Sequence, residues 1–296
     1  MIKSKREVLL PEIYFSIIIP VYNKAKFIER AISSVLNQRY DKYEIIIVDD
    51  GSTDESVDVI SRLNCENLRL ISQDNSGVSV ARNVGIKNSA YRYLAFLDAD
   101  DEWHEDYLLT ISNMIYNAPY FGMYGAPYRE SYMVDDKNKG EVRNFDYVDY
   151  LIKNKKSPFN ASCVVIDKSS LISYDLFPSG ISSGEDNFAW LYLVNSGIEI
   201  NYIDRALCIY HQDDESSLTS KQKAKPIHPI LNSLHLFNQI PEHKLKYLVK
   251  LLEDDFIKSQ ILFGERMLVL RYVSENFKWY HFKYIALLAI PKVVFR

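Results

Sequence analysis

The sequence predicts an α/β fold in which a mixed sheet is flanked by helices and followed by a helical C-terminal extension. Short apolar runs, rich in β-branched and aromatic residues, alternate with helical patterns four times at the start of the chain. Strands that alternate with helices form parallel sheets with right-handed crossovers. The composition, 47% hydrophobic and 25% charged, is that of a globular protein with a real core. The pattern from residue 226 onward is that of helices.

Four strands are expected first, each a short apolar run that ends at turn residues. They cover 15–20, 43–48, 68–71 and 93–97. The helices between them are predicted from apolar residues at helical spacing. Asn23 is expected to cap the first helix, Ser52 and Glu55 have capping-box spacing for the second, and Ser76 opens the third.

Beyond residue 104 the pattern is less regular. A helix is predicted from Trp103 to Ile115, and another follows Gly184. Strands are expected over 120–127, 161–167 and 206–210, with a polar hairpin or loop over 128–145. The chain therefore divides into an N-terminal extension (1–14), an α/β domain (15–222) and a helical region (223–296).

The overall charge and the cysteines argue against several classes of protein. The net charge of −4 disfavours nucleic acid as the main partner. Cys65, Cys163 and Cys208 form neither a metal pattern nor a disulfide framework, which favours a reducing, cytoplasmic compartment. No run reaches the roughly 18 apolar residues of a spanning helix. The basic N-terminus lacks the apolar run of a signal peptide.

Acidic residues follow the fourth predicted strand directly. Asp98, Asp100, Asp101 and Glu102 come after the apolar run 93–97. Ligands of open α/β sheets lie beyond the carboxyl ends of the strands. Carboxylates this close repel each other, and Mg²⁺ or Mn²⁺ is the usual remedy. The sequence therefore predicts a metal–phosphate site; the alternative is an acidic loop that opens a helix, whose dipole favours acids.

Polar turns also follow the first two strands, at the same edge of the sheet. They are Tyr22-Asn23 and Asp49-Asp50-Gly51. Polar groups that converge at strand ends are typical of a nucleotide site. The chain has no G-x-G-x-x-G after the first strand and no G-x-x-x-x-G-K-[ST], which argues against dinucleotide oxidoreductases and P-loop enzymes.

Four motifs together resemble those of the family 2 glycosyltransferases. They are Ser-Ile-Ile-Ile-Pro-Val-Tyr-Asn at 16–23, Ile-Val-Asp-Asp-Gly-Ser-Thr-Asp at 47–54, Asn-Ser-Gly-Val-Ser-Val-Ala-Arg-Asn at 75–83 and Phe-Leu-Asp-Ala-Asp-Asp at 96–101. The resemblance implies a GT-A fold, with a nucleotide-sugar-binding half over 15–103 and an acceptor-binding half over 104–222. It also implies inverting transfer of a sugar from a nucleoside diphosphate sugar, most often a UDP-sugar.

The resemblance assigns donor roles to residues of these motifs. It implies that the nucleotide is bound by Pro20, Tyr22, Asp50, Arg82 and Asp98. Tyr22 would contact the base, Asp50 would accept a hydrogen bond from it, and Asp98 would meet the ribose or a metal-bound water. Asp100 would bind Mn²⁺ or Mg²⁺, which stabilises charge on the leaving diphosphate. Taken singly, these residues also fit ordinary turn, packing or surface roles.

A second acidic pair, Glu185 and Asp186, precedes a helical pattern. Inverting transfer needs a carboxylate that takes the proton of the acceptor hydroxyl. The resemblance gives this role of general base to Asp186, and an acceptor or orienting contact to Glu185. The alternative is that acids favour the first helical turn.

The segment around His211 matches the family only loosely. His211 is a candidate third metal ligand or diphosphate contact, although a lone histidine is more often neither. Residues 216–219 are a candidate lid over the donor.

The C-terminal region differs in charge from the rest of the chain. Residues 241–296 have 10 Lys/Arg and 6 Asp/Glu, net +4, so residues 1–240 have 25 and 33, net −8. Aromatic residues, lysines and a short apolar core over 277–296 are typical of a helix at a membrane surface. The apolar stripe over 241–274 fits packing on the α/β domain or on a second subunit. Peripheral contact with the cytoplasmic face of a membrane and a homo-oligomer are the two hypotheses here.

Three functions can be compared. The leading hypothesis is a metal-dependent inverting glycosyltransferase that extends a glycan or lipid-linked acceptor in bacterial surface polysaccharide, lipopolysaccharide or glycoprotein glycan synthesis. A sugar-nucleotide nucleotidyltransferase is disfavoured, because the loop at 21–26 lacks the glycines usual in that class. An inactive glycosyltransferase-like binding subunit is disfavoured because Asp98, Asp100 and Asp186 are all present.

Overall fold

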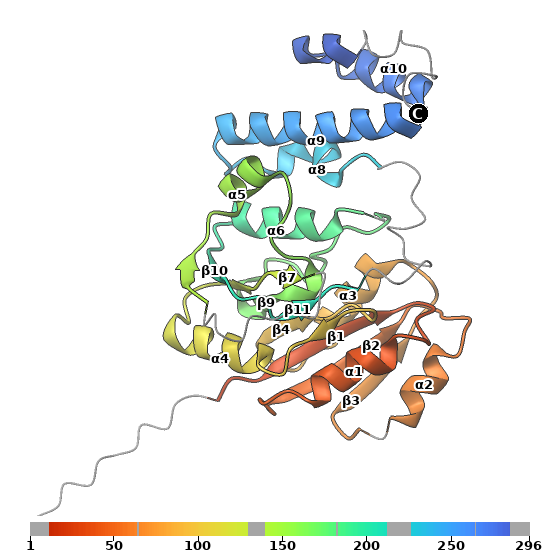
Figure 1. Cartoon of the computed structure of the whole chain (residues 1–296), viewed down its shortest axis with the longest axis vertical. Coiled ribbons are helices and arrows are strands. Elements are labelled where there is room, and N and C mark those ends of the chain that lie inside the picture. The colour runs from red at the N-terminus through yellow and green to blue at the C-terminus, as the bar shows by residue number, and fades with distance from the viewer. Residues whose placement is uncertain are drawn as a thin grey trace, which may run out of the picture.

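The structure is a computed structural model, and it describes residues 12–63, 65–129, 140–181, 183–211, 226–263 and 265–284 (Figure 1). Four sequence-based expectations fall partly or wholly outside these ranges. They are most of the N-terminal extension, the centre of the polar segment 128–145, the candidate lid at 216–219 and the last residues of the candidate membrane helix.

The core is an eight-stranded sheet with the order β3-β2-β1-β4-β9-β6-β10-β8. Its strands are β1 Phe15–Val21, β2 Tyr43–Asp49, β3 Leu68–Ser72, β4 Tyr93–Phe96, β6 Met123–Gly125, β8 Val142–Asn144, β9 Val164–Asp167 and β10 Ile200–Ile203. The first four strands are parallel, as predicted, because helices return the chain to the same end each time. The sheet is mixed because β9 runs antiparallel to both β4 and β6.

A second, three-stranded sheet has the order β5-β11-β7. Its strands are β5 Glu102–Trp103, β7 Tyr128–Arg129 and β11 Cys208–Ile209. The helix predicted to begin at Trp103 therefore begins later, at Tyr107, because Trp103 pairs with Cys208 in this sheet.

Helices cover the large sheet and continue beyond it. They are α1 Ile28–Leu36, α2 Ser56–Arg62, α3 Val78–Asn88, α4 Tyr107–Asn117, α5 Tyr147–Asn154, α6 Glu185–Asn195, α8 Pro229–Asn232, α9 Glu242–Phe263 and α10 Arg266–Glu275. Short 3₁₀ turns lie at Ala161–Cys163, Lys168–Ser170, Leu234–Leu236 and Trp279–His281. Figure 1 shows α8, α9 and α10 stacked above α5 and α6, far from α1 and α2.

The strand β1 lies between β2 and β4 in the sheet, and every one of its residues is buried. Helix α3 packs closely on this strand at Gly85. A Cβ atom at Gly85 would stand 2.3 Å from Cγ2 of Ile18, so only glycine allows this approach.

The sequence predicted that Asn23 and Ser52 cap the helices that follow them, and this prediction is wrong. The N-cap residues are Phe27 for α1 and Glu55 for α2. Asn23 has a left-handed backbone (φ 54°), and its Oδ1 accepts from the backbone N–H of Thr53 at 2.7 Å. Ser52 Oγ in turn accepts from the backbone N–H of Asn23 at 3.0 Å. Because β1 and β2 are neighbours, their turns bond to each other, which fixes both loops at one edge of the sheet.

The C-terminal helices have two packing environments. Helix α9 contacts α5 and α8, and Leu248 of α9 belongs to the main hydrophobic core. A second, smaller core joins α9 to α10. Below it, Tyr272, Lys278 and Tyr280 donate hydrogen bonds to the buried carboxylate of Glu253. Across the described ranges, no helix has the length and apolar character needed to cross a bilayer.

Candidate active site

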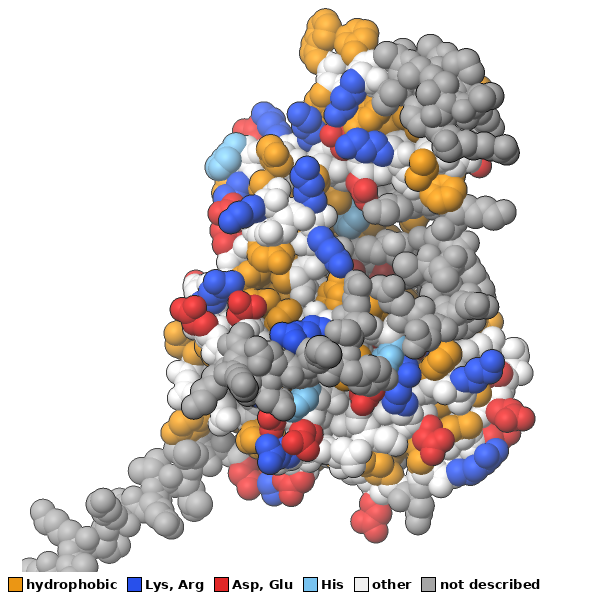
Figure 2. Space-filling view, in the orientation of Figure 1, with side chains coloured by type: hydrophobic (Ala, Val, Ile, Leu, Met, Phe, Trp, Pro, Cys, Tyr) orange, Lys and Arg blue, Asp and Glu red, His pale blue; other side chains and the backbone are white. Residues whose placement is uncertain are grey.

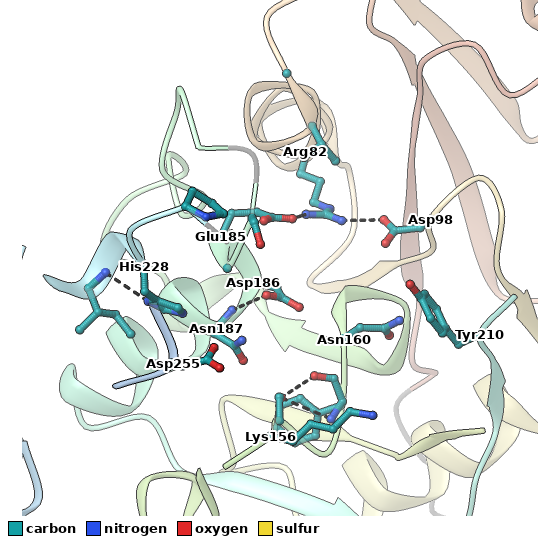
Figure 3. Close-up of a pocket in the computed structure, with 18 of the residues that line it drawn as sticks. Arg82, Asp98, Lys156, Asn160, Glu185, Asp186, Asn187, Tyr210, His228 and Asp255 are labelled. Carbon is teal, nitrogen blue, oxygen red and sulfur yellow. Dashed lines mark hydrogen bonds and ion pairs between the residues drawn. The ribbon is translucent and has the colours of Figure 1, made fainter. Parts of the chain in front are cut away.

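A cavity of about 1330 Å³ opens at the carboxyl ends of β1, β2 and β4 and extends to α9 (Figure 3). It is lined by most of the side chains predicted to carry function. These are Pro20, Tyr22, Asp50, Arg82, Asp98, Asp100, Glu185 and Asp186. The structure thus brings together motifs that are separated by as many as 166 positions in the sequence, since Pro20 and Asp186 line one space.

Arg82, on α3, joins the two acidic motifs. Its side chain is only 3% exposed; Nη2 lies 2.6 Å from Oδ1 of Asp98, and Nη1 lies 3.0 Å from Oε1 of Glu185 (Figure 3). Burial disfavours the charge of Arg82, but the two carboxylates outweigh this cost and raise its pKa above the ordinary value. The bridge fixes the end of β4 relative to the start of α6.

Asp186 lies in the first turn of α6, next to Glu185. The backbone N–H of Asn187 donates to its Oδ1 at 2.6 Å, and its carboxylate points into the cavity (Figure 3). Burial, together with the charge of Glu185, raises the pKa of Asp186 to about 7. A base whose pKa is near neutral can take a proton and still be largely ionised at physiological pH.

Asp50 organises the loop that leads into α3. Its Oδ1 accepts from the backbone N–H of Ser76 and from Nε2 of Gln73, and its Oδ2 accepts from the N–H of Gly77 at 2.8 Å. A carboxylate has about four acceptor positions, so Asp50 can accept a further hydrogen bond from a ligand. Tyr22 also lines the cavity, is 46% exposed and offers a ring face for stacking.

The other two aspartates at the end of β4, Asp100 and Asp101, lie in different environments from Asp98 and from each other. Lys24 Nζ lies 2.5 Å from Oδ2 of Asp100, and Arg30 donates to the backbone carbonyl of Asp100 at 2.6 Å. Asp101 was expected to lie at the start of a helix, but it precedes the short strand β5 instead. It is buried, Ser162 donates to its Oδ2 at 2.5 Å, and burial with the charges of Asp98 and Asp100 raises its pKa well above the ordinary value.

Carboxylates are the side chains of this cavity that suit a divalent cation. Among the side chains that the structure places, no cluster of three or more His, Cys, Asp and Glu could enclose a metal. His211 is buried with Nε2 3.3 Å from Oε2 of Glu102, and it is not among the described residues that line the cavity. Mg²⁺ and Mn²⁺ are commonly held by one or two carboxylates and completed by water and phosphate. Asp98 and Asp100 are the two carboxylates that would hold such a cation, and each already pairs with a basic side chain, Asp98 with Arg82 and Asp100 with Lys24.

Sequence reasoning missed three residues of the site. Lys24 could have been found, because it directly follows the turn predicted at the end of β1. His228 and Asp255 also line the cavity, yet they come from the C-terminal helices and belong to no motif.

Comparison with known proteins places this geometry in a family. The sequence model described as "Glycosyl transferase family 2" matches residues 16–177. An uncharacterized glycosyltransferase of Rickettsia felis is 33% identical over 65% of this chain, but over only 32% of its own length. The chain thus spans about a third of that relative. TuaG of Bacillus subtilis, a glycosyltransferase named for teichuronic acid biosynthesis, is 30% identical over 71% of this chain and 83% of its own.

Solved structures agree in fold. Residues 1–349 of Staphylococcus aureus TarS, in complex with UDP-GlcNAc, superpose with a TM-score of 0.67 and 19% identity, covering 92% of this chain and 78% of that one. The mixed sheet with flanking helices is therefore the GT-A fold expected from the motifs. The chain belongs to glycosyl transferase family 2.

Proposed function

We propose that this chain is an inverting glycosyltransferase that moves a sugar from a nucleoside diphosphate sugar, with UDP as the favoured nucleotide, to a glycan or lipid-linked acceptor. The observation that carries the proposal is the Asp98–Arg82–Glu185 bridge, which holds a donor-side acid and the segment of Asp186 in one cavity. The name of the relative TuaG supports a role in bacterial surface polysaccharide synthesis. Lipopolysaccharide and glycoprotein glycan synthesis are further destinations of the same proposal.

The donor would occupy the end of the cavity near β1 and β2. Tyr22 offers a stacking face for the base, Asp50 an acceptor for an imide N–H, and Asp98 an acceptor for a ribose hydroxyl. Lys24 and Arg82 place positive charge where the diphosphate would lie. Asp100, with Asp98 beside it, would hold Mn²⁺ or Mg²⁺, which supplies Lewis-acid stabilisation of the leaving diphosphate.

The acceptor would approach from the α6 side. Asp186 takes the proton of the acceptor hydroxyl as its oxygen bonds to the anomeric carbon, while the carbon–oxygen bond to the diphosphate breaks and its electron pair leaves with the diphosphate. Attack opposite to the leaving group inverts the anomeric centre. Glu185, oriented by Arg82, keeps a second carboxylate next to this reaction.

A donor screen tests the proposal. Among UDP-glucose, UDP-galactose, UDP-N-acetylglucosamine, UDP-glucuronate and GDP-mannose, one UDP-sugar with Mn²⁺ is expected to raise the melting temperature and to be consumed with release of UDP. Because metal stabilisation of a leaving group contributes several kcal/mol, Asp100→Ala should reduce UDP release by about 10²–10³-fold.

The exposed Asp41→Ala is the matched control and should behave as wild type. UDP release that survives both chelation and Asp100→Ala would contradict the metal role. Formation of a sugar nucleotide from nucleoside triphosphate and sugar phosphate would identify a nucleotidyltransferase. Binding without any turnover would identify an inactive binding subunit.

We also propose that the C-terminal surface contacts the cytoplasmic face of a membrane. Trp279 is 82% exposed, and its ring lies 5.5 Å from that of the exposed Phe282. Lys278 and Lys283 flank these rings in the sequence, and Met267 of α10 is also exposed. Figure 2 shows apolar side chains over α10 at the top of the view, with basic side chains near them. Exposed aromatic and basic residues together are typical of surfaces that bind anionic lipid.

The test is flotation with vesicles that contain a quarter phosphatidylglycerol. Trp279→Ser with Phe282→Ser is expected to lower the bound fraction several-fold, since each aromatic ring buries substantial apolar area in the interface. Shortening the chain at Glu275 is a poorer test, because it removes the lysine and tyrosine that bind buried Glu253. Tyr120→Ser, at another exposed aromatic, is the control. Equal flotation of all variants would contradict the proposed membrane contact. A concentration-dependent dimer that the double change abolishes would instead identify this surface as a contact with a second subunit.

A further inference from the structure

The far wall of the cavity is formed by the C-terminal helices, outside the part of the chain that carries the family motifs. Besides His228 before α8, the lining residues from α9 include Leu248, Leu252, Asp255 and Phe256. Their spacing places them along one side of α9, which turns both apolar and polar side chains toward Asp186.

His228 presents a neutral hydrogen-bond donor at this wall. The backbone N–H of Ile230 donates to its Nδ1 at 3.4 Å, which leaves the proton of the neutral ring on Nε2. Burial lowers the pKa of His228 to about 4, so the ring carries no charge at neutral pH. Nε2 lies 2.9 Å from the position that a Cβ on Gly184 would take, immediately before Glu185 and Asp186.

Two further polar groups stand on the same side of Asp186. Asn187 follows it directly, and the Tyr147 hydroxyl donates to Oδ1 of Asn187 at 2.7 Å, which fixes the amide. Asp255 reaches in from α9, and Figure 3 shows Asn187, His228 and Asp255 gathered beside Asp186, on the side away from Asp98. The group therefore lies on the acceptor side of the base.

We propose that His228, Asn187 and Asp255 form an acceptor subsite that binds a sugar ring next to Asp186. The combination fits this class of ligand. A neutral N–H donor, an amide and a carboxylate can bind adjacent hydroxyls, while the partly buried Leu252 would offer an apolar surface to the C–H face of the ring. The inference rests on the proposed transfer reaction and names the chemistry of its acceptor.

The subsite is tested by saturation-transfer NMR on the full chain with UDP and Mg²⁺, which is diamagnetic and leaves the ligand signals sharp. The probes are the methyl glycosides of glucose, galactose, mannose and N-acetylglucosamine. At least one glycoside is expected to bind. His228→Ala and Asp255→Asn should each weaken its binding about three- to tenfold, the effect of losing one hydrogen bond. His228→Gln, which restores an N–H donor, should recover part of the affinity. UDP binding should stay within twofold of wild type in these variants. The control His243→Ala, at an exposed histidine on α9, should change the affinity for neither UDP nor the glycoside.

Each other result has a distinct meaning. Failure of UDP to bind would overturn the proposed function itself. If UDP binds and no glycoside does, or if the glycoside binds the variants as well as wild type, the subsite is wrong. If His228→Ala and His228→Gln both lose UDP and glycoside together, His228 supports the fold around Gly184 and binds no acceptor, which also overturns the inference.

Discussion

Replacing Asp186 with asparagine is expected to lower the rate of sugar transfer by about 10²–10⁴-fold, the usual contribution of a general base. Asparagine has the same shape but cannot take the proton of the acceptor hydroxyl. Nucleotide binding should persist, because the groups proposed to bind the base, Tyr22 and Asp50, come from the ends of β1 and β2 and not from α6. The measurement is UDP release in the presence of acceptor, together with calorimetric titration of UDP and Mn²⁺. Asp175→Asn, at an exposed aspartate, is the control.

The pH profile of the wild type gives a second view of the same group. Since the pKa of Asp186 is about 7, the carboxylate is mostly protonated below pH 6 and mostly ionised above pH 8. Only the ionised form can accept a proton, so transfer should fall about tenfold per pH unit below 7 and level off above it. A flat profile between pH 5 and 8, or full activity in Asp186→Asn, would show that another group takes the proton.

Replacing Arg82 with alanine should have the largest effect on stability. Arg82 is buried and pairs with both Asp98 and Glu185, so its removal leaves two carboxylates without their cation. Breaking a buried pair in this way typically costs about 3–5 kcal/mol of unfolding free energy. Arg82→Lys should recover little, because one ammonium cannot reproduce two directed N–H contacts on opposite sides. Urea denaturation measures the loss.

The chain offers a matched control for this experiment. Arg92 also pairs with an aspartate, with Nη2 2.6 Å from Oδ2 of Asp167, but its side chain is 55% exposed. Exposed pairs contribute about 0–1 kcal/mol because water screens them, so Arg92→Ala should cost little. Equal losses for the two arginines would mean that the bridge at Arg82 does not hold the halves of the site together.

The sequence was sufficient for the parallel half of the sheet but insufficient for the strands β8 and β10 and for the loops. The four parallel strands could be predicted because each is an uninterrupted apolar run between turn residues. The capping roles of Asn23 and Ser52 were wrong because these side chains bond across neighbouring turns, a contact that depends on strand order. The prediction for Asp101 failed for the same reason. Its partner Ser162 comes next to β4 only because the antiparallel strand β9 pairs with β4.

The site was predictable wherever a residue followed a strand directly. Asp50, Asp98 and Asp100 line the cavity because carboxyl ends of parallel strands meet at one edge. His228 and Asp255 could not be found in this way. They reach the cavity through the packing of α8 and α9, which the helical pattern predicts only as an apolar stripe. Their assignment to an acceptor stays a prediction for the experiments above.

The contact between Gly184 and His228 limits how this chain can be recombined with its relatives. Position 184 has a left-handed backbone (φ 79°), and the imidazole fills the space that any side chain there would need. A hybrid joined near residue 223, with the C-terminal region of a relative, would therefore keep Gly184 but lose the histidine that packs against it. Exchange of acceptor preference between family members would require the segment around 184 and the segment around 228 to be transplanted together.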